Sequence, residues 1–230
     1  MLRVEGIHTY YGDSYVLQGV SMEVGEAAII GLLGRNGMGK TTLIRSIMGF
    51  TRPRQGRVLF KEKEITHQRS FEISRMGVSL IPQGRQIFPS LNVAENLIVA
   101  SREEKGGWTL ERVYEIFPPL KQRERHPGNL LSGGEQQMLA IGRSLMTNPS
   151  LILMDEPTEG LSPLFVQSVG QVIRKLREGG ISILLVEQNL RFALRFTDYV
   201  HLLSRGRIVY SASPEELDHD QEVKSRYLGV

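Results

Sequence analysis

The segment GRNGMGKTT (34–42) has the residue types and the spacing of a phosphate-binding loop. It follows the pattern G-x-x-x-x-G-K-[ST] after an apolar run and before a helical pattern. Glycines let backbone N–H groups approach phosphate oxygens, and a helix N-terminus adds partial positive charge. Lys40 is expected to reach the β- and γ-phosphates, and the Thr41 hydroxyl to bind Mg²⁺. The nucleotide-binding residues predicted here are Gly34, Arg35, Asn36, Gly37, Met38, Gly39, Lys40, Thr41 and Thr42.

A second group of polar residues ends the apolar run LILMDEP (151–157). Asp155 is expected at the end of a buried strand, where a carboxylate is unfavourable unless it meets a cation such as Mg²⁺ on bound phosphates. Glu156 is expected on the opposite side of the strand, where it can polarise a water for attack on the γ-phosphate. Alternatively, both residues only cap the next helix. Beside the loop at 34–42, we favour Asp155 as a metal ligand and Glu156 as the catalytic base.

The run ILLVEQN (183–189) places three more polar residues after a buried strand. A continuous apolar run is typical of a strand in a parallel sheet, and ligands bind beyond the carboxyl ends of such strands. We therefore expect 187–189 to lie at the ligand-binding edge.

The elements that must position these residues alternate between strands and helices, which indicates an α/β fold. Strands are expected at 4–9, 16–24, 27–33, 57–61 (after a turn at Gln55-Gly56), 77–82, 151–156 and 183–187, with a hairpin at 199–212 turned at Arg205-Gly206. Helices are expected from Lys40 to Gly49, at 93–100, 110–117, 163–178 and 190–196, and in two short pieces at the end of the chain, with Pro118-Pro119 as a break.

Composition limits the possible classes of protein. The 230 residues carry a net charge of +3 without a block of like charges, which gives no argument for nucleic acid as a partner. The absence of cysteine excludes disulfides and cysteine-based metal sites. The N-terminus lacks the apolar core of a signal peptide, and no window of about 18 apolar residues occurs. We expect a cytoplasmic protein that works at a membrane only through a partner.

The segment LSGGEQQ (131–137), together with GRNGMGKTT and LILMDEP in this order, resembles the nucleotide-binding subunit of ATP-binding cassette (ABC) transporters. This resemblance implies a P-loop NTPase core with an N-terminal antiparallel β subdomain and a helical signature subdomain. It implies one ABC ATPase domain over 1–230, with the core at 1–83 and 147–230 and the helical subdomain at 84–146. Ser132, Gly133 and Gly134 then close on the γ-phosphate that a second subunit holds.

The resemblance also implies roles for single residues. Tyr11 matches the aromatic residue that stacks on adenine, with the neighbouring Tyr10 as the alternative. Gln83 matches the glutamine that senses Mg²⁺ and the attacking water. Gln188 stands where most of the family has a histidine on the γ-phosphate. An amide can donate a hydrogen bond there but cannot take up a proton near neutral pH.

Two further segments follow from the same resemblance. Ser162 replaces the usual aspartate of the loop that crosses to the second subunit, which weakens the expected coupling between the two sites. Ile87, Phe88 and Pro89 follow Gln83 and are candidate docking residues for a transmembrane partner, although ordinary packing explains each of them equally well.

VEQN, TEGLSP, IPQGRQIF and the ending RYLGV resemble the second ATPase subunit of importers for branched-chain amino acids and related amides, including urea. We favour branched-chain amino acids. The partners implied are transmembrane permeases, a second ABC ATPase subunit and, indirectly, a periplasmic solute-binding protein. ATP and Mg²⁺ are the implied cofactors, and the cytoplasmic face of the inner membrane is the implied location. The alternatives are a urea or amide importer, a cytosolic ABC ATPase outside transport, and a regulatory subunit that binds ATP without hydrolysing it.

Overall fold

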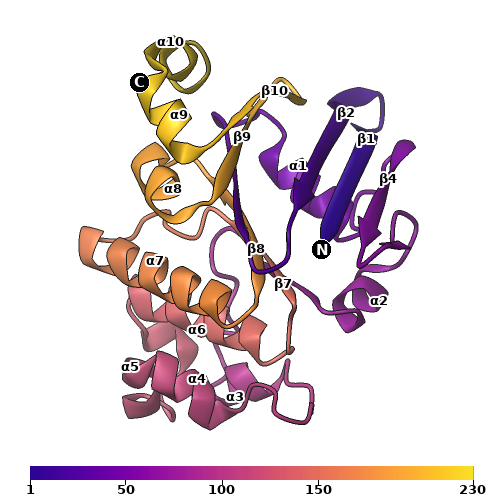
Figure 1. Cartoon of the computed structure of the whole chain (residues 1–230). Helices are drawn as coiled ribbons and strands as arrows, with labels where there is room; N and C mark the ends of the chain where they lie inside the picture. The colour runs from indigo at the N-terminus through magenta and orange to yellow at the C-terminus, as the bar shows by residue number, and fades with distance from the viewer. Residues whose placement is uncertain (230) are drawn as a thin grey trace.

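The computed structural model describes residues 1–229 and contains two β-sheets with helices around them (Figure 1). One sheet has four strands in the order β2-β1-β4-β5, and the other has six in the order β10-β9-β3-β8-β7-β6. The predicted α/β class is confirmed, because the parallel strands of the larger sheet alternate with helices along the chain, beside an antiparallel sheet from the N-terminal part.

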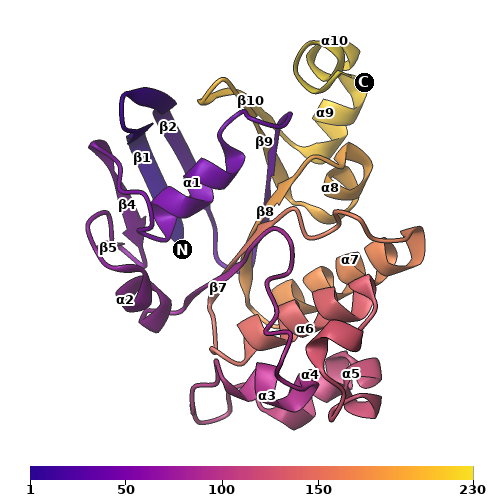
Figure 2. The same cartoon turned by 180° about the vertical axis from the view of Figure 1, so that it is seen from behind.

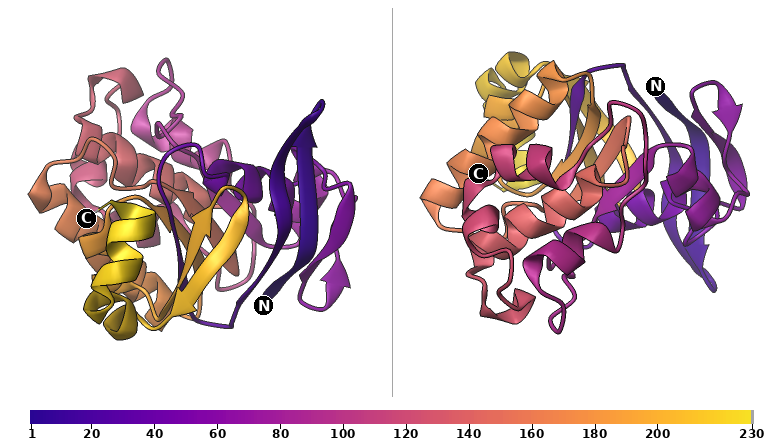
Figure 3. Two further views of the ribbon diagram at one scale, coloured as in Figure 1. Left: turned by 90° about the horizontal axis from the view of Figure 1, so that it is seen from above. Right: turned by 90° about the horizontal axis from the view of Figure 1, so that it is seen from below.

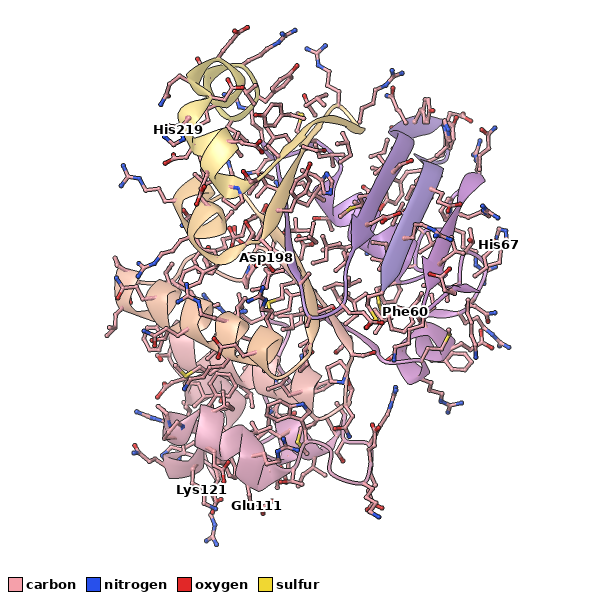
Figure 4. All side chains as sticks on the ribbon, in the orientation of Figure 1. Phe60, His67, Glu111, Lys121, Asp198 and His219 are labelled. Atoms are coloured by element: carbon pink, nitrogen blue, oxygen red, sulfur yellow. The ribbon has the colours of Figure 1, made fainter. Side chains whose placement is uncertain are left out.

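The smaller sheet is formed by the N-terminal part of the chain, and its strands are β1 (Leu2–Tyr11), β2 (Ser14–Val24), β4 (Gln55–Phe60) and β5 (Lys63–Glu64). Its pairs are antiparallel and its buried residues largely alternate, as in a sheet with one covered face. Phe60, labelled in Figure 4, is fully buried. The predicted turn at Gln55-Gly56 is wrong, since both residues belong to β4. Gly56 has φ 86°, and a Cβ there would lie 2.3 Å from the Gly6 carbonyl oxygen.

The larger sheet holds the central strands β3 (Ile29–Leu33), β8 (Ser182–Glu187) and β7 (Leu151–Asp155), with β6 (Val78–Ile81) at one edge. Every residue of β3, β7 and β8 is buried, which matches the continuous apolar runs in the sequence. The three strands are parallel, and Leu33 pairs with Glu187 while Asp155 pairs with Val186. Their carboxyl ends therefore lie side by side, and the loops that follow them leave the same edge.

Helix α1 (Lys40–Ile47) lies between the two sheets, as Figure 2 shows from behind. Its apolar residues Leu43, Ile44 and Ile47 belong to one buried cluster with residues of both sheets. This contact fixes the position of the helix that begins directly after the glycine-rich loop.

A group of helices lies at the other side of the larger sheet and comprises α3 (Val93–Ile98), α4 (Leu110–Ile116), α5 (Pro118–Gln122) and α6 (Gly133–Leu145), with α7 (Pro163–Glu178) beside them (Figure 1). Pro118 and Pro119 begin α5 instead of breaking the chain, because proline is well tolerated in the first turn of a helix. In Figure 4, Glu111 and Lys121 project from these helices at the surface. The division of the chain at 84–146 stays a prediction.

The remaining elements are α2 (Ser70–Arg75), α8 (Leu190–Phe196), the hairpin β9 (Tyr199–Ser204) and β10 (Arg207–Ala212), then α9 (Pro214–His219), α10 (Gln221–Val223) and a π-helical turn at Lys224–Leu228. The hairpin turns at Arg205 and Gly206 as predicted. Figure 3 shows the C-terminal helices beside α8 and away from the antiparallel sheet. Within residues 1–229, no helix is both long and apolar enough to span a bilayer.

We predict that Gly170→Ala lowers the melting temperature. A Cβ at Gly170 of α7 would lie 2.2 Å from the Phe196 ring of α8, so the two helices would have to separate. Overpacking of this kind costs about 1–3 kcal/mol, or several degrees in a chain of this size. Gly179→Ala at the C-terminus of α7 is the control, because a Cβ there meets neighbours at 3.4 Å. Equal melting temperatures for the two variants in a calorimetric scan would contradict the prediction.

Candidate functional site

The glycine-rich loop connects β3 to α1, which is the context its pattern requires. Gly34 has no room for a side chain, since a Cβ would lie 2.4 Å from the Leu203 carbonyl oxygen. Gly39 precedes α1 with φ 105°, a conformation that suits glycine. Among residues 1–229 no side chain caps α1, so the free N–H groups of its first turn remain available to an anion.

Lys40 is 4% exposed, and its ammonium group lies inside the loop. Nζ donates to the carbonyl oxygens of Gly34 at 2.8 Å and Arg35 at 3.2 Å. Nζ also lies 3.1 Å from Oε1 of Glu156. The structure thus brings the predicted phosphate-binding lysine and the predicted catalytic base into one ion pair.

Asp155 ends β7 and is 3% exposed. Burial raises the pKa of this carboxyl, and the neighbouring charge of Glu156 acts in the same direction, while a hydrogen bond from Thr41 and the charge of Lys40 oppose them. Its Oδ1 atom has no hydrogen-bond partner within residues 1–229. A buried carboxylate oxygen without a partner, next to a threonine hydroxyl, is a donor set that fits a hard cation such as Mg²⁺.

No group of three or more histidine, aspartate or glutamate side chains that could hold a metal occurs in the described part of the chain. Mg²⁺ at Asp155 and Thr41 would therefore take further ligands from phosphate oxygens and water, which is its usual arrangement in nucleotide sites.

Glu156 does not point away from Asp155 as the strand pattern predicts. Its backbone has φ 49°, outside the strand conformation, and its N–H donates to the carbonyl oxygen of Val186. This turn directs the carboxylate toward Lys40, so both acidic residues face the same loop. A non-glycine residue at positive φ is strained, and such strain is common at functional sites.

Gln83 follows β6 and reaches the same place. Its Nε2 donates to Oε2 of Glu159 at 3.0 Å and lies 3.5 Å from Oε2 of Glu156. Sequence reasoning missed Glu159, because only the fold brings the loop after β7 against the residues after β6. The structure therefore joins Gln83 to the predicted base.

Gln188 is exposed and lines a small hollow together with Gly34 and Arg35. The preceding residue, Glu187, lies at the expected ligand-binding edge but is 2% exposed, and the sequence indicates no separate role for it. The signal that could have found it is a carboxylate at the end of a fully apolar strand, the same signal that identifies Asp155.

The two adjacent tyrosines of β1 have different surroundings. The ring of Tyr10 stacks on Tyr15 with centroids 4.5 Å apart and an interplanar angle of 5°. The guanidinium of Arg54 lies 4.4 Å from the centroid of Tyr10. Tyr15 and Arg54 thus both pack against the ring of Tyr10, which leaves this ring less accessible to a base than an unstacked one.

Tyr11 is 43% exposed and lies beside α1. Burial alone would raise the pKa of its hydroxyl, but hydrogen bonds with Thr51 and Thr42 and the charge of Arg45 lower it overall. Thr42 belongs to the phosphate-binding segment, so Tyr11 stands at the mouth of the loop with an accessible ring.

The signature residues do not join the phosphate loop of the same chain. Ser132 caps α6 by accepting a hydrogen bond from the N–H of Glu135, and Gly133 and Gly134 form the first turn. Figures 1 and 2 both show α6 and α1 well separated, with strands of the larger sheet between them. Ser162 precedes Pro163 at the start of α7, and its side chain makes no capping bond.

Of the candidate docking residues, Phe88 is 46% exposed and Pro89 is exposed, whereas Ile87 packs against the core. Phe88 lines a groove of about 740 Å³ that runs from α2 to the end of β7. The residues Thr41, Gln83 and Asp155 line the same groove. A partner bound at Phe88 would therefore lie close to the candidate metal site.

We predict that Asp155→Asn raises the melting temperature at pH 8. Removing the charge of this buried carboxylate recovers about 1–2 kcal/mol, or about 2–8 °C. Folding raises the pKa of Asp155 above its value in the unfolded chain. The contribution of this carboxyl to the stability of the folded state is therefore fully present below the unfolded-state pKa and is lost as the pH rises through the raised pKa.

The gain from Asp155→Asn should therefore be larger at pH 8 than at pH 5, in calorimetry without nucleotide or Mg²⁺. Asp13→Asn, in the exposed turn between β1 and β2, is the control and should change little. Destabilisation by Asp155→Asn at both pH values would refute the assignment of Asp155 as an unfavourably buried charge.

Comparisons with known proteins agree with this geometry. The family model described as ABC transporter matches residues 17–159. The high-affinity branched-chain amino acid transport ATP-binding protein BraG of Pseudomonas aeruginosa is 38% identical over 232 residues, which cover all of both chains. The lipopolysaccharide export system ATP-binding protein LptB of Acidithiobacillus ferridurans is 32% identical and covers 100% of this chain and 97% of its own length.

Among solved structures, a nucleotide-free ATP-binding cassette from an ABC transporter superposes with a TM-score of 0.87 at 30% identity. The match covers 97% of this chain and 96% of that one. Sequence and fold thus agree over nearly the whole length, and the chain belongs to the ABC transporter family as one of its ATP-binding and ATP-hydrolysing subunits.

Proposed function

We propose that this chain is the ATPase subunit of an importer for branched-chain amino acids. The observation that carries the ATPase part is the meeting of Lys40, Thr41, Asp155 and Glu156 at the carboxyl edge of the larger sheet. The full-length similarity to BraG, a branched-chain amino acid transport protein, supports the substrate class. A urea or amide importer is the alternative within the same subfamily.

A second candidate is the ATPase of an exporter, because LptB of a lipopolysaccharide export system also matches the whole chain. BraG is more similar, at 38% identity against 32%. The substrate itself is selected by other subunits of a transporter. The higher identity to BraG therefore supports membership of the importer branch of the family, and not a contact between this chain and the substrate.

The proposed roles follow the positions of the side chains. Residues 34–42 cradle the phosphates, Lys40 neutralises their charge, Thr41, Asp155 and Gln83 hold Mg²⁺, and Tyr11 stacks on the base. When bound, Mg²⁺ neutralises phosphate charge and fixes the phosphate oxygens in the geometry for transfer.

The Lys40–Glu156 ion pair gives a physical reason for coupling between binding and catalysis. A γ-phosphate competes with the Glu156 carboxylate for the buried ammonium of Lys40. Glu156 released from this pair is free to accept a proton from the attacking water, a contribution of about 10²–10⁴ in rate for general bases. Gln188 can donate a hydrogen bond to a phosphate oxygen but cannot carry the proton, so the proton must pass to Glu156.

A complete site needs a second subunit. Helix α6, which begins with Gly133 and Gly134 after the N-cap Ser132, lies apart from α1, the helix that follows the phosphate loop (Figures 1 and 2). Two cassettes arranged head to tail place each N-terminus on the γ-phosphate of the other, where helix N–H groups bind an anion. We propose that the partner is a different ABC ATPase subunit in the assembled transporter and that the chain can also pair with itself.

The groove beside Phe88 supports docking of a transmembrane permease. Phe50, Phe71 and Phe88 line it with 46–50% of their surface exposed, an unusual concentration of exposed aromatic rings. Docking there would hold the chain at the cytoplasmic face of the inner membrane, with the periplasmic binding protein acting through the permease. We propose no role for nucleic acid.

The proposed base-stacking role predicts different effects for the two tyrosines. Tyr11→Ala should raise the KM for ATP about 10-fold with little change in kcat, because stacking contributes about 1–3 kcal/mol to binding and is not specific to the transition state. Tyr11→Phe keeps the ring, so its KM for ATP should stay within about 3-fold of the wild-type value, because only one exposed hydrogen bond is lost. Tyr10→Ala is the matched control; a larger rise in KM for Tyr10→Ala than for Tyr11→Ala would reverse the assignment.

The proposed function itself predicts Mg²⁺-dependent ATP hydrolysis with a rate per subunit that rises with protein concentration, because each site needs two chains. Glu156→Gln should lower kcat at least 100-fold, the contribution of a general base. It should bind ATP at least as tightly as wild type, since it no longer competes for Lys40.

Phosphate release and equilibrium binding of a fluorescent ATP analogue measure the two effects. Glu178→Gln, an exposed charge change on α7, is the control and should match wild type. Tight ATP binding without hydrolysis by the wild-type chain, with and without a companion cassette, would support a regulatory subunit instead.

A further inference from the structure

Glu187 is a buried carboxylate that neither the phosphate loop nor the metal site uses. It ends β8 with 2% of its surface exposed. Its oxygens accept four hydrogen bonds, from the N–H of Thr158 at 3.1 Å, the Thr158 hydroxyl at 2.7 Å, and the N–H groups of Gln188 and Asn189 at 3.2 Å each. A carboxylate offers about four acceptor positions, so the capacity of Glu187 is fully used.

The two oxygens serve different loops. Oε1 accepts both bonds from Thr158, which lies in the loop after β7 that also carries Glu156. Oε2 accepts both bonds from the turn 188–189 after β8. Since β7 and β8 are parallel neighbours, one carboxylate joins the loops that leave two adjacent strands at the ligand-binding edge.

A packing role alone does not account for this residue. No lysine or arginine lies within ion-pair distance of Glu187 in residues 1–229. Burial raises the pKa of this carboxyl, and only the hydrogen bonds from Thr158, Asn189 and Gln188 oppose that shift. An apolar residue would fill the same space without the desolvation of a carboxylate. The hydrogen bonds are therefore the property that an acidic residue adds at this position.

Gln188 depends on these bonds for its direction. Its side chain is exposed and makes no hydrogen bond of its own within the described residues. Its backbone N–H is held by Glu187, and its position beside Gly34 and Arg35 follows from that turn. A change in the Glu187 bonds would move the Gln188 amide relative to the phosphate loop.

We propose that Glu187 is a positioning residue that directs Gln188 toward the γ-phosphate and locks it to the loop carrying Glu156. The proposal rests on the proposed function, because it assigns Gln188 to the same ATPase site. It adds a physical link between the turn that contacts the γ-phosphate and the loop that supplies the base.

The first test is Glu187→Gln, which keeps the shape but places an NH₂ group against either Thr158 or the two N–H groups of the turn. We expect kcat to fall about 10-fold while the affinity for an ATP analogue changes less than about 3-fold, because Glu187 does not contact the phosphate loop. In a Gln188→Ala background the same substitution should change kcat less than about 2-fold, since the group it positions is gone.

Asp198→Asn is the matched control. Asp198, labelled in Figure 4, also accepts a backbone N–H, from Ile29, but at the opposite end of the larger sheet. It should lower the melting temperature without lowering kcat. If Asp198→Asn lowers kcat as much as Glu187→Gln does, for the same fall in melting temperature, the proposal is overturned. It is also overturned if Glu187→Gln lowers kcat in the Gln188→Ala background as much as it does in the wild-type chain.

Thr158→Val provides a second arm that needs no activity. It removes only the hydroxyl bond to Oε1, yet amide hydrogen exchange at Gln188 and Asn189 should speed up several-fold because the shared carboxylate loosens. Unchanged exchange at 188–189 would refute the link even if Glu187→Gln failed to fold. A wild-type chain without Mg-ATPase activity, both alone and with a companion cassette, but with this coupled exchange would contradict the proposed function and leave the structural link intact.

Discussion

The parallel pairing of β3, β8 and β7 is the constraint on which the rest of the site depends. Parallel strands send the loops after them out of one edge. The phosphate loop, the turn at 188–189 and the acidic pair at 155–156 therefore meet there, although more than 100 residues separate the phosphate loop from the other two. Antiparallel pairing of any of these strands would place its polar residues at the far edge. The apolar burial of all three strands, which excludes water from the interior of the sheet, holds that register.

Positively and negatively charged groups lie close together at this edge of the sheet. Lys40 and the N-terminus of α1 supply positive charge, and Asp155, Glu156 and Glu159 supply negative charge. Within residues 1–229, Lys40 forms an ion pair with Glu156 alone among these carboxylates, and Asp155 keeps an oxygen without a partner. A divalent cation together with phosphates would satisfy both the acidic residues and the helix N-terminus, which is consistent with the proposed binding of Mg-ATP.

The residues that depart from the common family pattern lie in two neighbouring loops, the loop after β7 and the turn after β8. By the family resemblance, Gln188 stands where most of the family has a histidine and Ser162 where it has an aspartate. The hydrogen bonds of Glu187 join the loops that carry these two residues. A glutamine can only position, so the geometry of the turn has greater weight than it would for a group that also moves protons. The buried carboxylate of Glu187 supplies that geometry through four hydrogen bonds.

The sequence by itself determined the phosphate loop, the strand that ends at Asp155 and the α/β class, because each depends on local pattern: glycine spacing, helix start and continuous apolar runs. The family resemblance favoured Tyr11 over Tyr10 for stacking on the base, but the two rings are alike in sequence, and only the tertiary structure shows that Tyr15 and Arg54 pack against Tyr10. Nor could the sequence give the direction of Glu156, the contact of Glu159 with Gln83, or the four bonds of Glu187. These arise between segments far apart in the chain, and only the tertiary register of the parallel strands brings the segments together.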